Sequence, residues 1–205
     1  MRMGKNMLKE EDVMDITIKK LTPELTEDYL HFFDVTHHSS GKEEHRCYCV
    51  CWASTDSSFE DFTTASKRRE IAKRYIKNNF LQGYLAYSGD KVVGWCNTNT
   101  KSDCYESDSW KRFMRKINKD DRKVKSIFCF AIAPEFRRKG IASMLLKRAC
   151  EDAEKEGFEV VEAYPNTNYI DTEQDFMGTF SMYQKLGFTV EYEAGTKSIM
   201  TKKLR

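Results

Sequence analysis

The 205-residue chain lacks both a long apolar run and a marked excess of charge of one sign. Its apolar segments are far shorter than the roughly 20 residues of a membrane-spanning helix, and the N-terminus shows no apolar core of a signal peptide. The net charge is only +2, and lysine and arginine form no long run. Because a nucleic-acid-binding protein usually carries a concentrated basic face, we expect neither nucleic acid nor a membrane as a partner.

A full set of disulfides is also lacking, because seven cysteines cannot all pair within one monomer. Reduced thiols are typical of the cytoplasm, which is the expected location. The sequence shows neither internal repeats nor a low-complexity tract, and its 40% of apolar residues can bury one sizeable core. These features predict an N-terminal extension over residues 1–13 and a single domain over residues 14–205.

Periodicity and turn residues give the expected order of the helices and strands. Strands are predicted over residues 14–21, 83–87, 91–96, 123–133, 158–164, 188–193 and 197–203. Helices are predicted to begin at Thr22 and Ser58 and to span residues 138–156 and 176–186, with a short helical segment over 110–117. The polar insertion over residues 97–122 precedes the central strand, so we expect it to overhang the site as a lid.

The most informative segment lies between residues 127 and 146. An apolar strand is followed there by Pro134, a short basic turn and Gly140, which opens an amphipathic helix. The N-terminus of a helix gathers free N–H groups and the positive end of the helix dipole. This junction therefore indicates a site for a ligand that carries phosphate.

Two sequence blocks, Arg-Arg-Lys-Gly-Ile-Ala over 137–142 and Tyr-Gln-Lys-Leu-Gly-Phe over 183–188, lie on a strand-to-helix turn and at the end of a helix. With these blocks in this order, the sequence resembles the GCN5-related N-acetyltransferases. The resemblance is specific from about residue 123 to 190 and only general before that. The resemblance implies an α/β (α+β) fold with a mixed, strongly bent central sheet flanked by helices. In that fold the fourth and fifth strands splay apart and leave a V-shaped gap for acetyl-CoA.

The resemblance also implies how acetyl-CoA, the expected co-substrate, would be held. Backbone groups of the central strand would pair with the pantetheine arm as an added strand does, and amides of the following turn would cradle the pyrophosphate. Glycine and alanine in that turn allow close approach of the backbone. The expected cofactor-binding residues are Phe130, Ala131, Ile132, Arg137, Arg138, Lys139, Gly140, Ile141, Ala142 and Ser143. The alternative for the three basic residues is a solvated turn.

The implied reaction is direct attack of an amine on the acetyl thioester, without a covalent enzyme intermediate. An amine with a pKa near ~10 must lose a proton, and the oxyanion needs a donor, expected from a strand amide near Ala131. Tyr183 is the expected proton donor to the departing thiolate, because a phenol keeps its proton at pH 7; the alternative is a packed tyrosine. Glu162 is the first candidate for the general base, with Glu135, Asp171 and water as alternatives.

One departure from the resemblance falls on the helix before Tyr183. Many relatives carry an asparagine and an alanine at the positions of Phe176 and Thr179, so the hydrogen bond of that asparagine is not expected in this chain. The loop that holds Pro165, Asn166 and Asn168 is also longer than in a minimal member of the family, and it is expected to shape the acceptor pocket.

The segment Cys-Tyr-Cys-Val-Cys-Trp over residues 47–52 invites a metal interpretation, because His45 lies close by. Its spacing is not that of the usual zinc sites, and no second ligand pair follows, so no metal is expected. In an extended strand the three thiols would share one face, where small buried apolar residues are the simpler interpretation. By resemblance this segment lies beside the acceptor site. The expected substrate-binding residues are therefore Cys49 and Trp52, together with Tyr164.

The favoured function is an N-acetyltransferase that acts on a primary amine of a small molecule. Balanced charge and insertions of moderate size fit a small acceptor better than a histone-like tail. The relatives commonly form homodimers. Two alternatives remain: a non-catalytic acyl-CoA-binding sensor, and a thiol or metal protein that uses Cys47, Cys49 and Cys51. The intact block around Tyr183 favours catalysis over the sensor.

Overall fold

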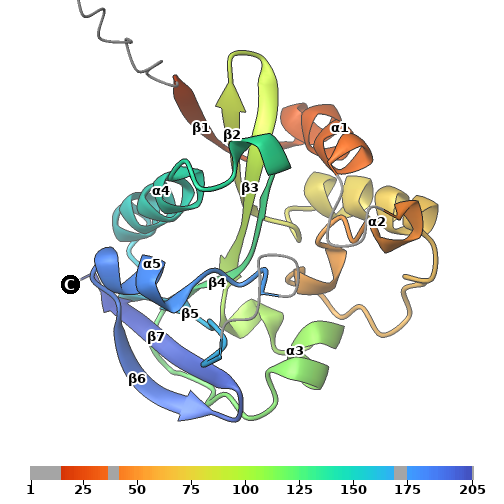
Figure 1. Ribbon diagram of the computed structural model, residues 1–205. Coiled ribbons are helices and arrows are strands. Elements are labelled where there is room, and N and C mark those ends of the chain that lie inside the picture. The colour runs from red at the N-terminus through yellow and green to blue at the C-terminus, as the bar shows by residue number, and fades with distance from the viewer. Residues whose placement is uncertain (1–14, 37–41, 169–174, 205) are drawn as a thin grey trace, which may run out of the picture.

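The structure is a computed structural model that describes residues 15–36, 42–168 and 175–204. A mixed seven-stranded sheet crosses the molecule in the order β1-β2-β3-β4-β5-β7-β6 (Figure 1). β4 and β5 run parallel, and the other neighbouring strands pair antiparallel. The strands are β1 (Ile16–Lys20), β2 (Gly83–Ser88), β3 (Lys91–Thr100), β4 (Val124–Ile132), β5 (Val160–Ala163), β6 (Thr189–Ala194) and β7 (Lys197–Lys203).

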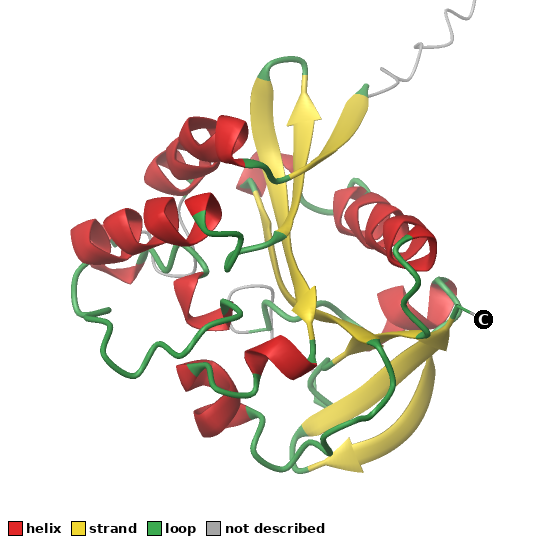
Figure 2. Cartoon of the chain, turned by 180° about the vertical axis from the view of Figure 1, so that it is seen from behind, coloured by secondary structure: helices red, strands yellow, loops and turns green. Residues whose placement is uncertain are grey.

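Helices cover both faces of this sheet (Figures 1 and 2). They are α1 (Thr26–Val35), α2 (Ala65–Lys77), α3 (Asp108–Phe113), α4 (Ile141–Lys155) and α5 (Phe180–Lys185). One face packs against α4 and α5, and the other packs against α1, α2 and α3. In the described part of the chain, no helix is both long and apolar enough to cross a membrane. The predicted α/β fold with a mixed sheet flanked by helices is confirmed.

A β-bulge in the middle of β4 decides which side chains reach each face. Asn97 of β3 pairs with Cys129 and Thr98 pairs with Ile127, so Phe128 is an extra residue without a partner. As a result Phe128 and Cys129 both lie in the core under α1 and α2, whereas Ile127 and Phe130 lie in the core under α4.

The gap that carries the site opens between β4 and β5. The two strands pair only where residues 124–127 of β4 lie beside residues 160–163 of β5. β4 continues to Ile132, whereas β5 ends at Ala163. The chain before α5 runs along the freed edge of β4, where the Phe130 N–H donates to the Phe176 carbonyl at 2.7 Å.

Two predicted helix starts are wrong. Before α2, the carboxylates of Asp56 and Asp61 accept backbone N–H groups two residues on, and such local bonds compete with a helix. α2 therefore begins after Thr64, whose hydroxyl caps the Lys67 N–H. Similarly, α5 begins after Thr179 rather than at Phe176.

The predictions for the two loop regions also need correction. β3 extends into the polar insertion as far as Thr100, and the rest of the insertion packs under the sheet through Trp110. The cysteine segment is not a strand, because Tyr48 and Cys49 adopt left-handed conformations with φ of 46° and 50° and lead into a short 3-10 turn. The thiols therefore do not follow the two-residue repeat of one strand face.

Candidate functional site

A cleft of about 480 Å³ lies at the gap between β4 and β5. Its walls come from the end of β4, the turn that opens α4, the segment before α5, α5 itself and the end of α1. The lining residues are Thr36, Phe130, Ala131, Ile132, Phe136, Arg137, Arg138, Gly140, Ile141, Ala142, Ser143, Asp175, Phe176, Gly178, Thr179, Ser181, Met182 and Lys185. All predicted cofactor-binding residues line this cleft except Lys139, whose ammonium lies 5.2 Å from the centre of the Phe136 ring. No residue of the insertion over 97–122 is part of this lining, so the lid prediction does not hold for this cleft.

The turn that opens α4 presents backbone donors to the cleft. Gly140 has φ of 81° and precedes the helix without a side-chain cap, and the first helical bond runs from the Met144 N–H to the Gly140 carbonyl. The N–H groups of the first turn, at residues 141–143, are therefore the free donors at the positive end of α4. A Cβ at Gly140 would meet nothing within 4 Å, so the glycine serves the backbone conformation and leaves the approach open. The cationic side chains of Arg137 and Arg138 add to this anion-binding character.

The edge of β4 offers two residues whose backbone faces the gap. The Ala133 N–H donates to the Val93 carbonyl of β3, and antiparallel alternation turns the backbone of Ala131 the same way. The backbone groups of Phe130 and Ile132 therefore point toward the gap. The carbonyl of Ile132 accepts from the Arg137 guanidinium at 3.2 Å. The candidate for the oxyanion donor that was expected near Ala131 is therefore the N–H of Ile132, because the Phe130 N–H already donates to the Phe176 carbonyl.

Tyr183 lies just behind the cleft wall and does not line it. Its ring is fully buried, and its hydroxyl donates to the Met177 carbonyl at 2.7 Å. Burial raises the pKa of Tyr183 well above its ordinary value, so the phenol keeps its proton. Gly178 separates this hydroxyl from the cleft: a Cβ there would lie 3.1 Å from the Tyr183 oxygen and 3.2 Å from the Phe130 ring.

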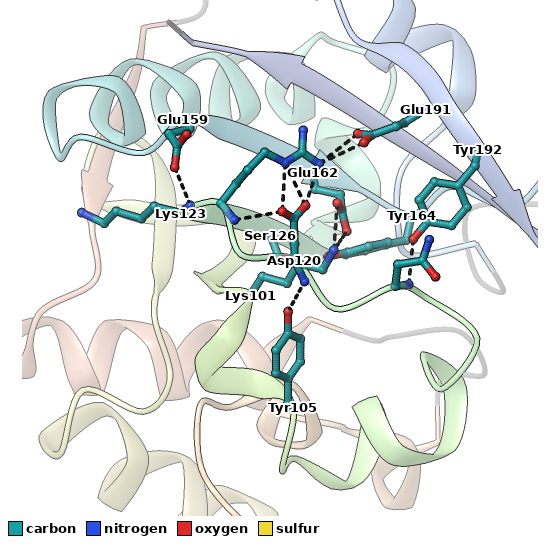
Figure 3. A network of polar contacts seen from close by, with 12 residues as sticks. Lys101, Tyr105, Asp120, Lys123, Ser126, Glu159, Glu162, Tyr164, Glu191 and Tyr192 are labelled. Atoms are coloured by element: carbon teal, nitrogen blue, oxygen red, sulfur yellow. Dashed lines mark hydrogen bonds and ion pairs between the residues drawn. The ribbon is translucent and has the colours of Figure 1, made fainter.

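Glu162 does not face the gap, contrary to the prediction. Its neighbours in β5, Val161 and Ala163, pack under α4, so the Glu162 side chain points to the other face of the sheet. There its carboxylate lies 2.8 Å and 3.0 Å from the ammonium of Lys101, and both side chains are almost fully buried (Figure 3). Burial raises the pKa of Glu162, and the charge of Lys101 acts in the opposite direction. This carboxylate is part of a buried ion pair and not of the cleft.

The other candidates for the base also lie elsewhere. Glu135 is exposed, binds Lys91 at 2.9 Å and is not part of the lining of the cleft. Asp171 lies outside the described residues.

The predicted acceptor-side residues Cys49, Trp52 and Tyr164 are buried behind the cleft rather than in its lining. The rings of Trp52 and Phe128 stack at 5.0 Å, and those of Phe128 and Tyr164 stack at 5.7 Å. Trp52 also lies 6.5 Å from the ring of Phe176, which does line the cleft. These side chains therefore form an aromatic layer behind the Phe176 wall.

Analysis of the sequence alone missed the wall formed by the segment before α5. Asp175 is buried there, and its carboxylate accepts a hydrogen bond from the Asn166 amide. Phe176 and Thr179, the two positions that depart from the family pattern, both line the cleft. The only signal in the sequence was that these residues immediately precede the block at Tyr183.

The comparisons with known proteins agree with this geometry. The model of the acetyltransferase (GNAT) family matches residues 48–188. No curated protein matches the sequence significantly.

Among solved structures, PaiA N-acetyltransferase from Thermoplasma acidophilum in complex with coenzyme A has a TM-score of 0.54 and 21% identity, over 93% of this chain and 99% of that one. An aminoglycoside acetyltransferase from an uncultured soil metagenomic sample has a TM-score of 0.53 and 17% identity, over 89% and 97%. The ribosomal-protein-S18-alanine N-acetyltransferase from Escherichia coli has a TM-score of 0.51 and 13% identity, over 93% and 94%. These structures share the fold of this chain. Because the family model matches more than half of its length, this chain belongs to the GNAT acetyltransferase family.

Proposed function

We propose that this protein is an acetyl-CoA-dependent N-acetyltransferase that acetylates a primary amine of a small molecule. The observation that carries the proposal is one cleft that joins the uncapped N-terminus of α4 to the open edge of β4. The first feature suits a pyrophosphate, and the second suits the amide-bearing pantetheine arm.

The cleft has the donor set that acetyl-CoA requires. Residues 141–143 supply backbone N–H groups, and Arg137 and Arg138 supply positive charge for the phosphates. At the other end the Ile132 N–H faces the gap, where it can donate to the oxygen of the thioester carbonyl. Negative charge develops on that oxygen during the attack, and a fixed amide donor stabilises it.

In the proposed reaction the amine nitrogen attacks the thioester carbon directly. The new C–N bond forms as the C–S bond breaks, and the proton of the amine passes to water, because none of the predicted carboxylate bases that the structure describes lies in the cleft lining. Tyr183 gives its proton to the departing thiolate after its hydroxyl leaves the Met177 carbonyl. The raised pKa of Tyr183 means that the phenol still holds its proton when the leaving group departs, and it also makes the phenol a weaker acid.

A small acceptor is supported by the way the segment before α5 narrows the gap. Phe176 lines the cleft, and its carbonyl is bonded to the edge of β4. The seven free cysteines support a reducing compartment such as the cytoplasm.

A non-catalytic acyl-CoA sensor is the second candidate. It is favoured by one observation: the Phe130 N–H and the Tyr183 hydroxyl, which both lie beside the gap, already bond to the segment before α5. If these contacts persist when the cofactor binds, the cleft would bind acetyl-CoA without turnover.

Calorimetry with coenzyme A and a turnover assay separate these possibilities. We expect saturable binding of coenzyme A and, with acetyl-CoA and a panel of primary amines, release of free coenzyme A together with an acetylated amine, both measured by chromatography. Binding without transfer to any amine would favour the sensor. Absence of binding would contradict both functions.

A further inference from the structure

The two ends of the cleft differ in whether their backbone donors are free. At the α4 end, the N–H groups of residues 141–143 precede the first helical bond and stay open to a ligand. At the β4 end, the Phe130 N–H already donates to the Phe176 carbonyl at 2.7 Å. Among the described residues, no hydrogen bond joins residues 176–178 to the turn over 137–143. The segment before α5 therefore covers one end of the cleft and leaves the other end open.

Two consecutive peptide carbonyls of this segment bond the two groups that the arm of the cofactor would use. The Phe176 carbonyl accepts from the edge of β4, where the pantetheine arm would pair as an added strand does. The Met177 carbonyl accepts from the Tyr183 hydroxyl at 2.7 Å, where the departing thiolate would accept the same proton. Pantetheine also carries amide carbonyls. The segment therefore offers β4 the same kind of acceptor that the arm would offer.

Gly178 lets the segment lie close to both groups. Its φ of 84° is one that a residue with a side chain rarely adopts. A Cβ at this position would lie 3.1 Å from the Tyr183 oxygen and 3.2 Å from the Phe130 ring. The segment therefore reaches into the space between β4 and Tyr183.

The side chain of Met177 anchors the segment from behind the cleft. Only 3% of the residue is exposed, and it packs in the core under α1, α2 and α3 without being part of the cleft lining. Its sulfur accepts a hydrogen bond from the Lys197 ammonium at 3.2 Å. A thioether is a weak acceptor, and each carbonyl bond of the segment is a neutral one. The segment is thus held by contacts that are individually weak and that a ligand can replace.

We propose that residues 176–178 hold the place of the pantetheine arm, and that the arm displaces them when the cofactor binds. The proposal rests on the proposed acetyl transfer and adds how the site is kept closed without a cofactor. The nucleotide end of the cofactor binds first at residues 141–143, and the arm then takes over the bonds to Phe130 and Tyr183. Because only the displaced state accepts the arm, the apparent affinity for coenzyme A is lowered by the fraction of molecules in that state.

The first test follows the hydrogen bond between β4 and the segment directly. The coupling across this bond, between the Phe130 nitrogen and the Phe176 carbonyl carbon, is measurable by NMR. The probes are coenzyme A and adenosine 3′-phosphate 5′-diphosphate, a nucleotide that lacks the arm. We expect the coupling to persist with the nucleotide and to disappear with coenzyme A. The control is the coupling across the bond from the Ala133 N–H to the Val93 carbonyl, which should persist with both ligands.

The second test loosens the segment through Met177→Ala, which removes the anchor but no part of the cleft lining. In calorimetry, coenzyme A should bind about 3- to 10-fold more tightly, as expected for one lost weak contact of the closed state, and the affinity for the nucleotide should stay constant. Met114→Ala is the matched control, because Met114 is fully buried in the same core and is not part of the lining. It should lower stability and leave both affinities unchanged.

A coupling that persists at saturating coenzyme A would overturn the proposal, and so would its loss with the nucleotide alone. A folded Met177→Ala variant that binds coenzyme A no more tightly than the wild type would also overturn it. The first test uses the wild-type protein, so it decides even if Met177→Ala does not fold. Failure of the proposed function gives a different result, in which coenzyme A breaks the Phe130 bond and no amine is acetylated.

Discussion

Removing one partner of the Lys101–Glu162 pair tests whether Glu162 has a structural or a catalytic role. The two side chains are 3% and 1% exposed, and their charged atoms lie 2.8 Å apart (Figure 3). A surface pair is worth about 0–1 kcal/mol, but loss of one partner of a buried pair typically costs about 3–5 kcal/mol, because the other charge is left buried. Glu162→Gln should therefore lower the free energy of unfolding by about 3–5 kcal/mol.

The double variant Lys101→Met/Glu162→Leu removes both charges with apolar side chains of similar size. Replacing a whole buried pair in this way is often neutral, so we expect the free energy of unfolding to return to within about 1 kcal/mol of the wild type. Urea denaturation measures both values. Turnover of the folded double variant should match the wild type, because Glu162 does not line the cleft.

The opposite pattern would refute this reasoning. Loss of a general base typically slows a reaction about 10²- to 10⁴-fold. A double variant that is as stable as the wild type and slower by such a factor would return Glu162 to the reaction. A Glu162→Gln variant with unchanged stability would show that the pair does not hold the fold.

Three further predictions concern the cleft. Tyr183→Phe should lower kcat at least tenfold at constant KM for acetyl-CoA and cost about 1 kcal/mol of stability. Tyr29→Phe is the control, because it removes a similar buried hydrogen bond, to the Tyr48 carbonyl, and should lower stability alone. Because the pKa of Tyr183 is raised, the phenol keeps its proton as the pH rises. If kcat of the wild type already falls with rising pH before pH ~10 is reached, and kcat of Tyr183→Phe does not, the assignment is contradicted. Gly140→Ala should cost about 1–2 kcal/mol of stability, because alanine is strained at the positive φ of this position, and it should also weaken coenzyme A binding in calorimetry. Gly157→Ala is the control, because Gly157 has φ of 77° and open space around it, and it should show the stability cost alone. Gly178→Ala places a Cβ 2.8 Å from the end of Met182 and should lower both stability and kcat, and an unchanged kcat would argue against the link between this wall and Tyr183.

The sequence allowed the cofactor side to be predicted because its determinants are local. The strand over β4, the basic turn, Gly140 and the start of α4 follow one another within about twenty residues, and each has its own sequence signal. Gly187, with φ of 84°, likewise follows Leu186, the residue that caps the C-terminus of α5. Nearly all of the predicted cofactor-binding residues accordingly lie in one wall of the cleft.

The acceptor side could not be predicted in this way, because contacts between distant segments determine it. The orientation of Glu162 depends on Lys101, which lies 61 residues earlier, and alternation along a strand does not show which face holds a partner. The wall at Asp175 depends on Asn166 and on bonds to β4 and Tyr183, and no sequence motif carries them. The cysteine segment leaves the strand conformation at Tyr48 and Cys49, two residues that rarely adopt positive φ.

Amide hydrogen exchange with and without coenzyme A, followed residue by residue by NMR, tests the central claim most directly. If the start of α4 binds the phosphates and the edge of β4 pairs with the pantetheine arm, coenzyme A should slow exchange at the amides of residues 141–143 and of Ile132. The amide of Ala131, which faces β3, should be protected in both states. Saturable binding of coenzyme A that leaves exchange at these cleft amides unchanged would contradict the assignment of the cleft.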